Sequence, residues 1–240
     1  MIREEENFES GQSPEEALFN TLVEHFQTNQ TIRAKKESGN EIGNQDLLRK
    51  VTEDEAAWTK FIYQVKDKDA ARHFWEEAAD RLKGTGFESE LEGFKRGVVC
   101  QVAVLKCLDK LEQKSRLATP DEDMFNATDL WLKKESIAIQ VKGRKKLPGL
   151  AFISQEEVSF PAIEHEGNEA IHYIMVRDTE HETERFFAKI ERLAEIKHRP
   201  VKGFMIYIPE EMLENKDTGE PSEELFWAFK DEFYKHHLDS

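Results

Sequence analysis

The stretch ATDLWLKKESIAIQVKGRK, residues 127–145, decides the fold, because it has the pattern of two short strands joined by a turn. Apolar residues dominate on both sides of the polar segment 133–136, where we expect the turn. When the strands are paired outward from it, Asp129 lies opposite Gln140, and Lys142 follows one pleat further along. The stretch therefore predicts an antiparallel hairpin with three polar groups near its open end.

Side chains alternate between the two faces of a strand, and this separates the polar groups from the apolar ones. Asp129, Gln140 and Lys142 share one face. The other face is apolar and is expected to join the core: Leu130, Leu132, Ile137, Ile139 and Val141. A shift by one residue would bury polar groups, so the pattern specifies this register.

Two interpretations of the polar face stay open. It is either a solvated hairpin surface with an incidental lysine, or a site that holds a metal ion and a phosphate. Trp131 shares this face, so it either stacks on a base or is covered by a neighbouring helix.

The charge of the chain is unevenly distributed. The formal net charge is −15, which by itself disfavours nucleic acid as a partner. Residues 91–150 nevertheless hold 12 Lys or Arg against 8 Asp or Glu, so the hairpin lies in a basic segment. Its second strand is followed by Arg144, Lys145 and Lys146, which form either a set of phosphate contacts or a solubilising turn.

The composition is that of a soluble globular protein, with 38% hydrophobic and 35% charged residues among 240. No apolar run approaches the roughly 20 residues of a membrane span, and no signal peptide is recognisable, so we expect a cytoplasmic protein and no membrane partner. Cys100 and Cys107 lie seven residues apart on an expected helix, too far for a disulfide, and are predicted to be buried thiols.

Helical signals fill the first part of the chain, after a disordered tail expected at residues 1–12. Residues 13–87 predict a helical lobe of three or so helices. Ser13 caps the first helix, a polar loop is expected over 30–46, and a capping box from Thr52 to Glu55 opens the second helix.

The second part of the chain mixes helices and strands. Residues 88–114 predict a long helix, a turn-rich segment follows it, and the hairpin comes next. Strands at 170–178 and 201–210, with a helix between them, predict a βαβ unit with parallel strands, and an amphipathic helix closes the chain. The predicted fold class is α/β, more fully an α+β mixed sheet, with residues 88–240 as one domain.

Asp129, a ten-residue gap and then Gln140-Val141-Lys142 resemble the D…(D/E/Q)xK signature of the PD-(D/E)xK nuclease superfamily, in the QxK variant of Mrr-like endonucleases. The resemblance covers roughly residues 88–209. It implies a restriction-endonuclease-like core of a helix, a three-stranded meander, a second helix and a further strand. Residues 88–114 would be the first helix, and the hairpin would supply the second and third strands.

The resemblance also implies roles for individual residues. Asp129 and Gln140 would be the metal ligands, and Lys142 would stabilise the scissile phosphate or orient the attacking water. The implied ion is Mg²⁺, for which Mn²⁺ can substitute. Some relatives add a Glu from the first helix, and the matching position here is Gln101. Two amides in place of carboxylates are departures from the pattern, and the literal Pro120-Asp121 lies in the turn segment.

The predicted function is therefore a metal-dependent nuclease that hydrolyses phosphodiester bonds, with DNA favoured over RNA. The alternative is a catalytically weakened protein of the nuclease fold that binds nucleic acid or a protein partner, with the acidic N-terminal lobe as docking surface. A homodimer is compatible with the first function, since paired nicking of a duplex needs two sites, but no residue pattern identifies an interface.

Overall fold

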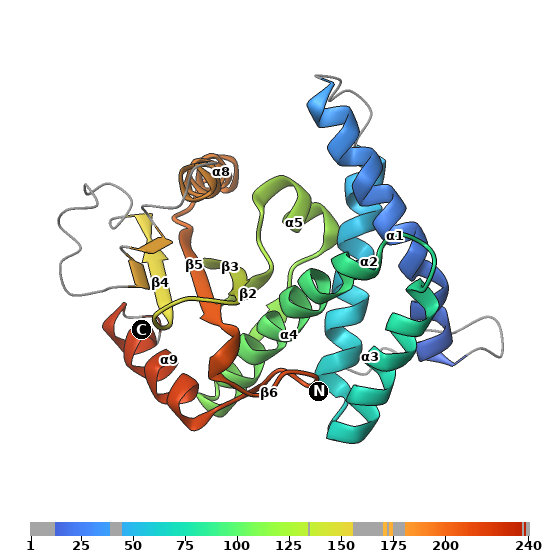
Figure 1. Ribbon diagram of the computed structural model, residues 1–240. Helices are drawn as coiled ribbons and strands as arrows, with labels where there is room; N and C mark the ends of the chain where they lie inside the picture. The colour runs from blue at the N-terminus through green and yellow to red at the C-terminus, as the bar shows by residue number, and fades with distance from the viewer. Residues whose placement is uncertain are drawn as a thin grey trace.

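The structure, a computed structural model, describes residues 13–38, 45–133, 135–155, 170–171, 173–174, 181–236 and 238. It is an α+β fold around a mixed five-stranded sheet, which confirms the broad fold class. Helix α4 (Glu88–Lys110) runs through the middle, with the helical lobe on one side and the sheet on the other (Figure 1). The predicted tail at 1–12 lies outside the described residues.

Three helices form the lobe, as predicted: α1 (Pro14–Glu37), α2 (Gln45–Gln64) and α3 (Lys68–Leu82). Ser13 caps α1, since its Oγ accepts the N–H of Glu16 at 3.2 Å. Aromatic rings fill the space between the helices: Phe19 and Phe74 stack with their centroids 4.8 Å apart. The lobe therefore has a packed interior rather than a loose helical surface.

Two predicted boundaries in the lobe are wrong. The second helix begins at Gln45 rather than at Thr52, and the Thr52 hydroxyl bonds the carbonyl oxygen of Arg49 at 2.8 Å inside the helix. The first helix continues to Glu37, into the segment predicted as a loop. Val51, one residue before Thr52, is buried in the core. Packing therefore adds residues to α2 on the N-terminal side of the capping signal, because tertiary contacts outweigh such local signals.

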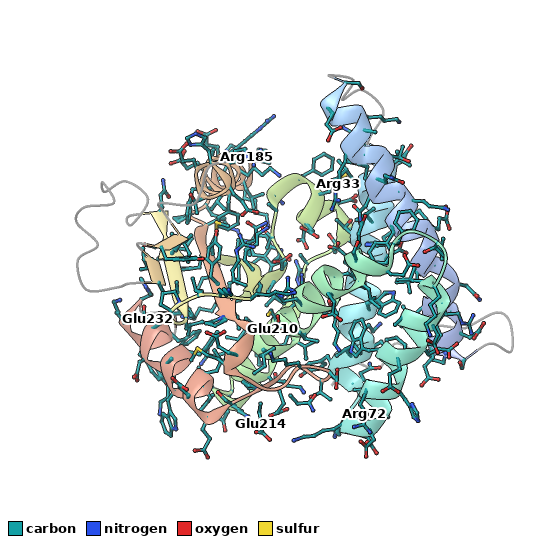
Figure 2. The ribbon with its side chains drawn as sticks, viewed as in Figure 1. Arg33, Arg72, Arg185, Glu210, Glu214 and Glu232 are labelled. Atoms are coloured by element: carbon teal, nitrogen blue, oxygen red, sulfur yellow. The ribbon has the colours of Figure 1, made fainter. Side chains whose placement is uncertain are left out.

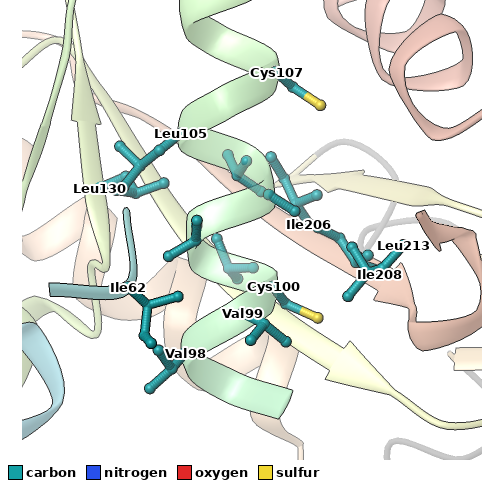
Figure 3. Close-up of a cluster of buried hydrophobic side chains, with 14 of the residues drawn as sticks. Ile62, Val98, Val99, Cys100, Leu105, Cys107, Leu130, Ile206, Ile208 and Leu213 are labelled. Carbon is teal, nitrogen blue, oxygen red and sulfur yellow. The ribbon is translucent and has the colours of Figure 1, made fainter. Parts of the chain in front are cut away.

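Helix α4 joins the lobe to the sheet in one hydrophobic core. Its buried side chains lie between Ile62 of the lobe and residues of the sheet such as Leu130 and Ile206 (Figure 3). Cys100 and Cys107 are buried free thiols, as predicted. Because this core is continuous, α4 fixes the position of the lobe relative to the sheet. The domain boundary at residue 87 stays a prediction.

The hairpin has the predicted register. Strand β2 (Leu130–Leu132) pairs antiparallel with β3 (Ile137–Arg144), and Trp131 is the partner of Ala138. Strand β3 then runs parallel to β5 (Lys202–Pro209). The edge strands are β1 (Ser115–Leu117) and β4 (Ala151–Ser154), each antiparallel to its neighbour, in the order β1-β2-β3-β5-β4.

Strand β3 packs unusually closely on α4. A Cβ atom added at Gly143 would lie 2.7 Å from Arg96 Cγ and 2.8 Å from Cys100 Sγ. Arg96 is itself held by an ion pair, with Nε 2.9 Å from Oε2 of Glu210, which Figure 2 shows beside the central helix. This position in the strand therefore has room only for glycine.

Helix α5 (Pro120–Asn126) occupies the segment that was expected to be turn-rich. Thr119 and Glu122 form a capping box at its start, and Pro120 occupies the first turn. Strand β1 precedes it, so the long helix before it ends at Lys110 rather than at 114. The presence of α5 matters for the site, because this helix lies between α2 and helix α8 (Glu182–Lys197) (Figure 1).

The strand predicted at 170–178 is wrong where the structure describes it: residues 170–171 and 173–174 are helical, and the rest lies outside the described residues. The parallel partner of β5 is β3, so that place in the sheet is already filled. Ala170, Ile171 and Ile174 instead pack into a second, smaller hydrophobic core, which includes Trp131 and Phe186, as a helical spacing allows.

The C-terminal elements match their predictions. α8 and β5 form as expected, and α9 (Glu223–Lys235) is capped by Ser222, whose Oγ accepts the N–H of Leu225 at 3.0 Å. Between β5 and α9 lie a 3₁₀ turn (Glu210–Met212) and a small hairpin of β6 (Leu213–Asn215) and β7 (Glu220–Pro221). Among the described helices, none is long and apolar enough to cross a membrane.

Candidate nuclease-type site

Asp129 stands directly before β2, where main-chain hydrogen bonds hold it. Its N–H donates to Ile139 O at 2.8 Å, and its carbonyl oxygen accepts the N–H of Ala118 at 2.9 Å. The side-chain Oδ2 accepts the N–H of Val141 at 2.5 Å. Main-chain groups of β3 and of Ala118, just after β1, thus hold Asp129. The ladder of β2 and β3 begins one residue later, with Leu130 opposite Ile139, so the predicted pairing of Asp129 with Gln140 lies just beyond it.

Gln140 presents an amide oxygen with unused hydrogen-bonding capacity. Its Oε1 is buried, and no described residue donates a hydrogen bond to it. Leaving a buried acceptor unpaired costs about 1–3 kcal/mol, so this atom would gain from a cation or a donor placed beside it.

Lys142 and Arg144 converge on one carboxylate of α8. Lys142 Nζ lies 2.6 Å from Glu182 Oε1, and Arg144 Nη2 lies 3.5 Å from Glu182 Oε2. The Lys142 side chain is 24% exposed, so the ion pair is partly shielded from water. Two cations that share one anionic group mark a place where a phosphate could replace that group.

Two further carboxylates reach the same place from other elements: Glu55 from α2 and Asp123 from α5. With Asp129 they line a pocket of about 10 Å³, which is the space of about one water molecule or ion. The Glu55 side chain is 38% exposed, so solvent reaches it at the edge of this pocket. Neither residue belongs to the predicted site.

The three carboxylates oppose one another's ionisation. Burial raises the pKa of Asp129, the Val141 N–H and Lys142 act against this, and Glu55 adds to the rise. Burial also raises the pKa of Asp123, helped by the charges of Asp129 and Glu55. The pKa of Glu55 is raised too, again mainly by burial. Such a group favours uptake of a proton or a cation.

Gln101 of α4 lines the same pocket, at the place predicted for a contribution from the first helix. Its Oε1 accepts a hydrogen bond from the hydroxyl of Thr59 at 2.8 Å. The oxygen therefore already has a protein partner, which makes Gln101 a weaker ligand candidate than Gln140.

The remaining predicted residues lie around this centre. Arg144, Lys145 and Lys146 are exposed where β3 ends, so they are accessible to a polyanion. Trp131 is 1% exposed, and Lys197 Nζ of α8 lies 4.6 Å from its ring centroid, so a helix covers it and it cannot stack on a base.

The site residues fit a metal ion only in part. Among the described residues, no three His, Cys, Asp or Glu side chains are placed to hold a metal by themselves. The Asp129 carboxylate and the unpaired Gln140 Oε1 are two hard oxygen donors. This set is small, but Mg²⁺ commonly keeps several waters and takes one or two protein oxygens. The two donors are therefore of the type that magnesium takes, and they make up only part of its ligand set.

A local signal could have identified Asp123 but not Glu55. The capping box at Thr119 and Glu122, with Pro120 between them, is visible in the sequence and predicts a short helix that carries Asp123. Glu55 lies 74 positions before Asp129, and only the packing of α2 against α4 and α5 brings the two together.

Compared with protein families, with curated proteins and with solved structures, the chain has no match.

Proposed function

We propose that the protein is a metal-dependent nuclease of the PD-(D/E)xK type that hydrolyses phosphodiester bonds, in DNA rather than RNA. One observation carries this proposal: Asp129 accepts the N–H of Val141 from β3, the strand that carries Gln140 and Lys142, and it lines a cleft together with Glu55 and Asp123. Carboxylate, amide oxygen and lysine are the groups that such hydrolysis uses.

The order of elements supports the same family. Helix α4, the antiparallel strands β1, β2 and β3, then α8 and β5 follow the helix, meander, helix and strand of a restriction-endonuclease-like core, with α5 inserted between β1 and β2 and β4 between β3 and α8. β1 supplies the first strand of the meander, which the sequence did not predict. The lobe at 13–87 is then an addition that contributes Glu55 to the cleft.

The residues of the chain divide the chemistry between them. Asp129 and Gln140 would hold Mg²⁺ or Mn²⁺, which when bound lowers the pKa of a coordinated water and neutralises phosphate charge. Lys142 would leave Glu182 and bind the phosphate, placing a positive charge where negative charge develops. Arg144, Lys145 and Lys146 would contact flanking phosphates without reading sequence.

Cleavage of plasmid DNA in Mg²⁺ or Mn²⁺ tests the proposal. The wild type is expected to nick or linearise the plasmid, and Asp129→Asn to be inactive while it stays folded. Asp121→Asn is the matched control, because Asp121 is exposed in the first turn of α5 and does not line the cleft. Equal activity of wild type and Asp129→Asn overturns the assignment.

A second function is favoured by one observation, the ion pair of Lys142 with Glu182. A lysine that stays on this carboxylate cannot act on a phosphate, and the chain would then bind nucleic acid or a protein without cutting. Equal inactivity of wild type and Asp129→Asn, with DNA binding retained in both, supports this binding function. Absence of both cleavage and DNA binding leaves a protein-binding role.

A further inference from the structure

A second cavity, of about 370 Å³, opens on the lobe side of the site. It lies between α1, α2 and the start of α4, and its lining includes His25, Asn29, Arg33, Glu55, Ser89 and Phe94. The volume lies near the lower end for small-molecule sites, roughly 300–1,000 Å³, so it suits one nucleotide-sized group rather than a large ligand.

The apolar part of this cavity is aromatic. The rings of His25 and Phe94 lie 4.8 Å apart, and Phe26 meets Phe94 edge to face at 5.7 Å. Phe26 is 2% exposed and belongs to the core, whereas Phe94 is only partly buried. Phe94 therefore offers a firmly supported ring to a flat ligand.

The polar part is rich in hydrogen-bond acceptors. Glu55 and Glu90 contribute carboxylates, which accept hydrogen bonds only. Asn29 Nδ2 lies 3.0 Å from His25 Nε2, which leaves the amide oxygen of Asn29 to face other partners. His25 is 1% exposed; because its Nε2 accepts from Asn29, its Nδ1 carries the ring proton, lies 3.5 Å from Asp54 Oδ2 and adds no acceptor to the lining. A ligand that donates N–H groups fits this lining, and an anion does not.

Glu55 connects this cavity to the proposed catalytic site, because its side chain lines both. Arg33 stands at the outer rim, 70% exposed, with Nη1 3.9 Å from Glu90 Oε2. Figure 2 shows Arg33 on α1 and Arg185 on α8, on the two sides of α5. A strand bound at the proposed catalytic site would therefore have the aromatic cavity beside it, with the positive charge of Arg33 at the rim.

We propose that the cavity binds one unstacked nucleobase of the nucleic-acid strand, a base with an exocyclic amino group. This inference rests on the proposed nuclease function and adds substrate recognition to it. The base stacks on Phe94, and its amino group donates to acceptors of the wall, among them Asn29 and Glu55. Bases taken out of the stack are commonly held in this way, by an aromatic face and hydrogen bonds to the base edge.

The test measures affinity for short single-stranded DNA in EDTA, where cleavage is absent. A single abasic position is moved along the oligonucleotide, and each position is compared with the intact strand. We expect one position at which base loss weakens binding about tenfold, as one stacked base contributes. Thymine at that position is expected to bind more weakly than adenine, cytosine or guanine.

Two variants locate the effect. Phe94→Leu removes the ring at similar volume, and Asn29→Ala removes the amide; both are expected to bind intact and abasic strands equally. Gln30→Ala is the matched control on α1, since Gln30 is exposed and does not line the cavity, and it should keep the tenfold difference. Failure of every position to matter, or equal weakening of all oligonucleotides by the two variants, overturns the proposal.

Plasmid cleavage, measured on the same samples, separates this proposal from the function. Metal-dependent cleavage without any position-specific effect removes the base site and leaves the nuclease in place. Where the wild type neither cleaves nor binds nucleic acid, the nuclease function fails. Ligand-observed NMR with free adenosine, cytidine and guanosine then decides whether the cavity binds a base. Saturation transfer that Asn29→Ala abolishes supports a base site, and no transfer overturns it.

Discussion

Lys142 and Gly143 are neighbours on β3, yet they belong to two very different regions. Gly143 faces α4, where a single added carbon would collide with Arg96 and Cys100. Lys142 lies on the other face, next to Glu182 and beside a cleft in which carboxylates repel one another. One face of the strand packs tightly against α4, and the other lies beside carboxylates whose burial and proximity make their ionisation unfavourable. Such unfavourable arrangements are typical of functional sites.

The largest expected effect is on catalysis, from Lys142→Met. This change keeps the length of the side chain but removes its charge, so we expect cleavage to fall about 10²–10³-fold. The free energy of unfolding should change by less than about 1 kcal/mol, because partly exposed ion pairs contribute little. Plasmid cleavage and urea unfolding measure the two quantities, with Lys202→Met as the control, because Lys202 is exposed at the start of β5, at the opposite end of the β3–β5 pair from Lys142. A stability loss that explains the lost activity would contradict the division between the faces.

Gly143→Ala tests the opposite face. Overpacking of the contact with α4 is expected to lower the free energy of unfolding by about 1–3 kcal/mol. Gly149→Ala is the control, because no atom lies within 4 Å of a Cβ at that position. Urea unfolding of both variants gives the comparison. If Gly143→Ala is as stable as Gly149→Ala, α4 and β3 are less closely packed than described.

Glu182→Gln sharpens the comparison on the charged face. It frees Lys142 and Arg144 from their shared carboxylate, so affinity for DNA is expected to rise a few-fold, with a steeper dependence on salt. Fluorescence anisotropy in EDTA measures both. Glu184→Gln changes the net charge equally at a residue that pairs with His181 instead, and it should have the smaller effect. Equal gains in the two variants would mean that only net charge matters.

The smallest effect concerns pH. Burial and neighbouring carboxylates raise the pKa of Asp123 to about 8, from an ordinary value of about 4. The folded state therefore holds a proton that the unfolded state has lost, so stability from this group is present at low pH and decreases as pH rises from about 4 to 8. In EDTA, Asp123→Asn should flatten the decrease of Tm between pH 5 and 8. The same slope in wild type and variant would show that Asp123 does not titrate in this range.

Much of the hairpin was predictable because its determinants are local. The alternation of apolar residues from Leu130 to Val141 leaves one register that buries them, and the structure has it. Capping residues set the starts of α1 and α9 in the same way. The strand expected at 170–178 is wrong at the four residues that the structure describes, because its apolar run suits either a strand or a buried helix, and the pairing of β5 with β3 and β4 decides between them.

The sequence by itself determined which side chains of the hairpin share a face: Asp129, Gln140 and Lys142 on one side, and the apolar set on the other. Period-two alternation and turn position are properties of a short segment. Only the tertiary structure decided that Glu55 and Asp123 join Asp129, that Glu182 binds Lys142, and that α8 covers Trp131. These contacts join segments far apart in the chain, and they depend on how α2, α5 and α8 pack around the sheet, which no local pattern encodes.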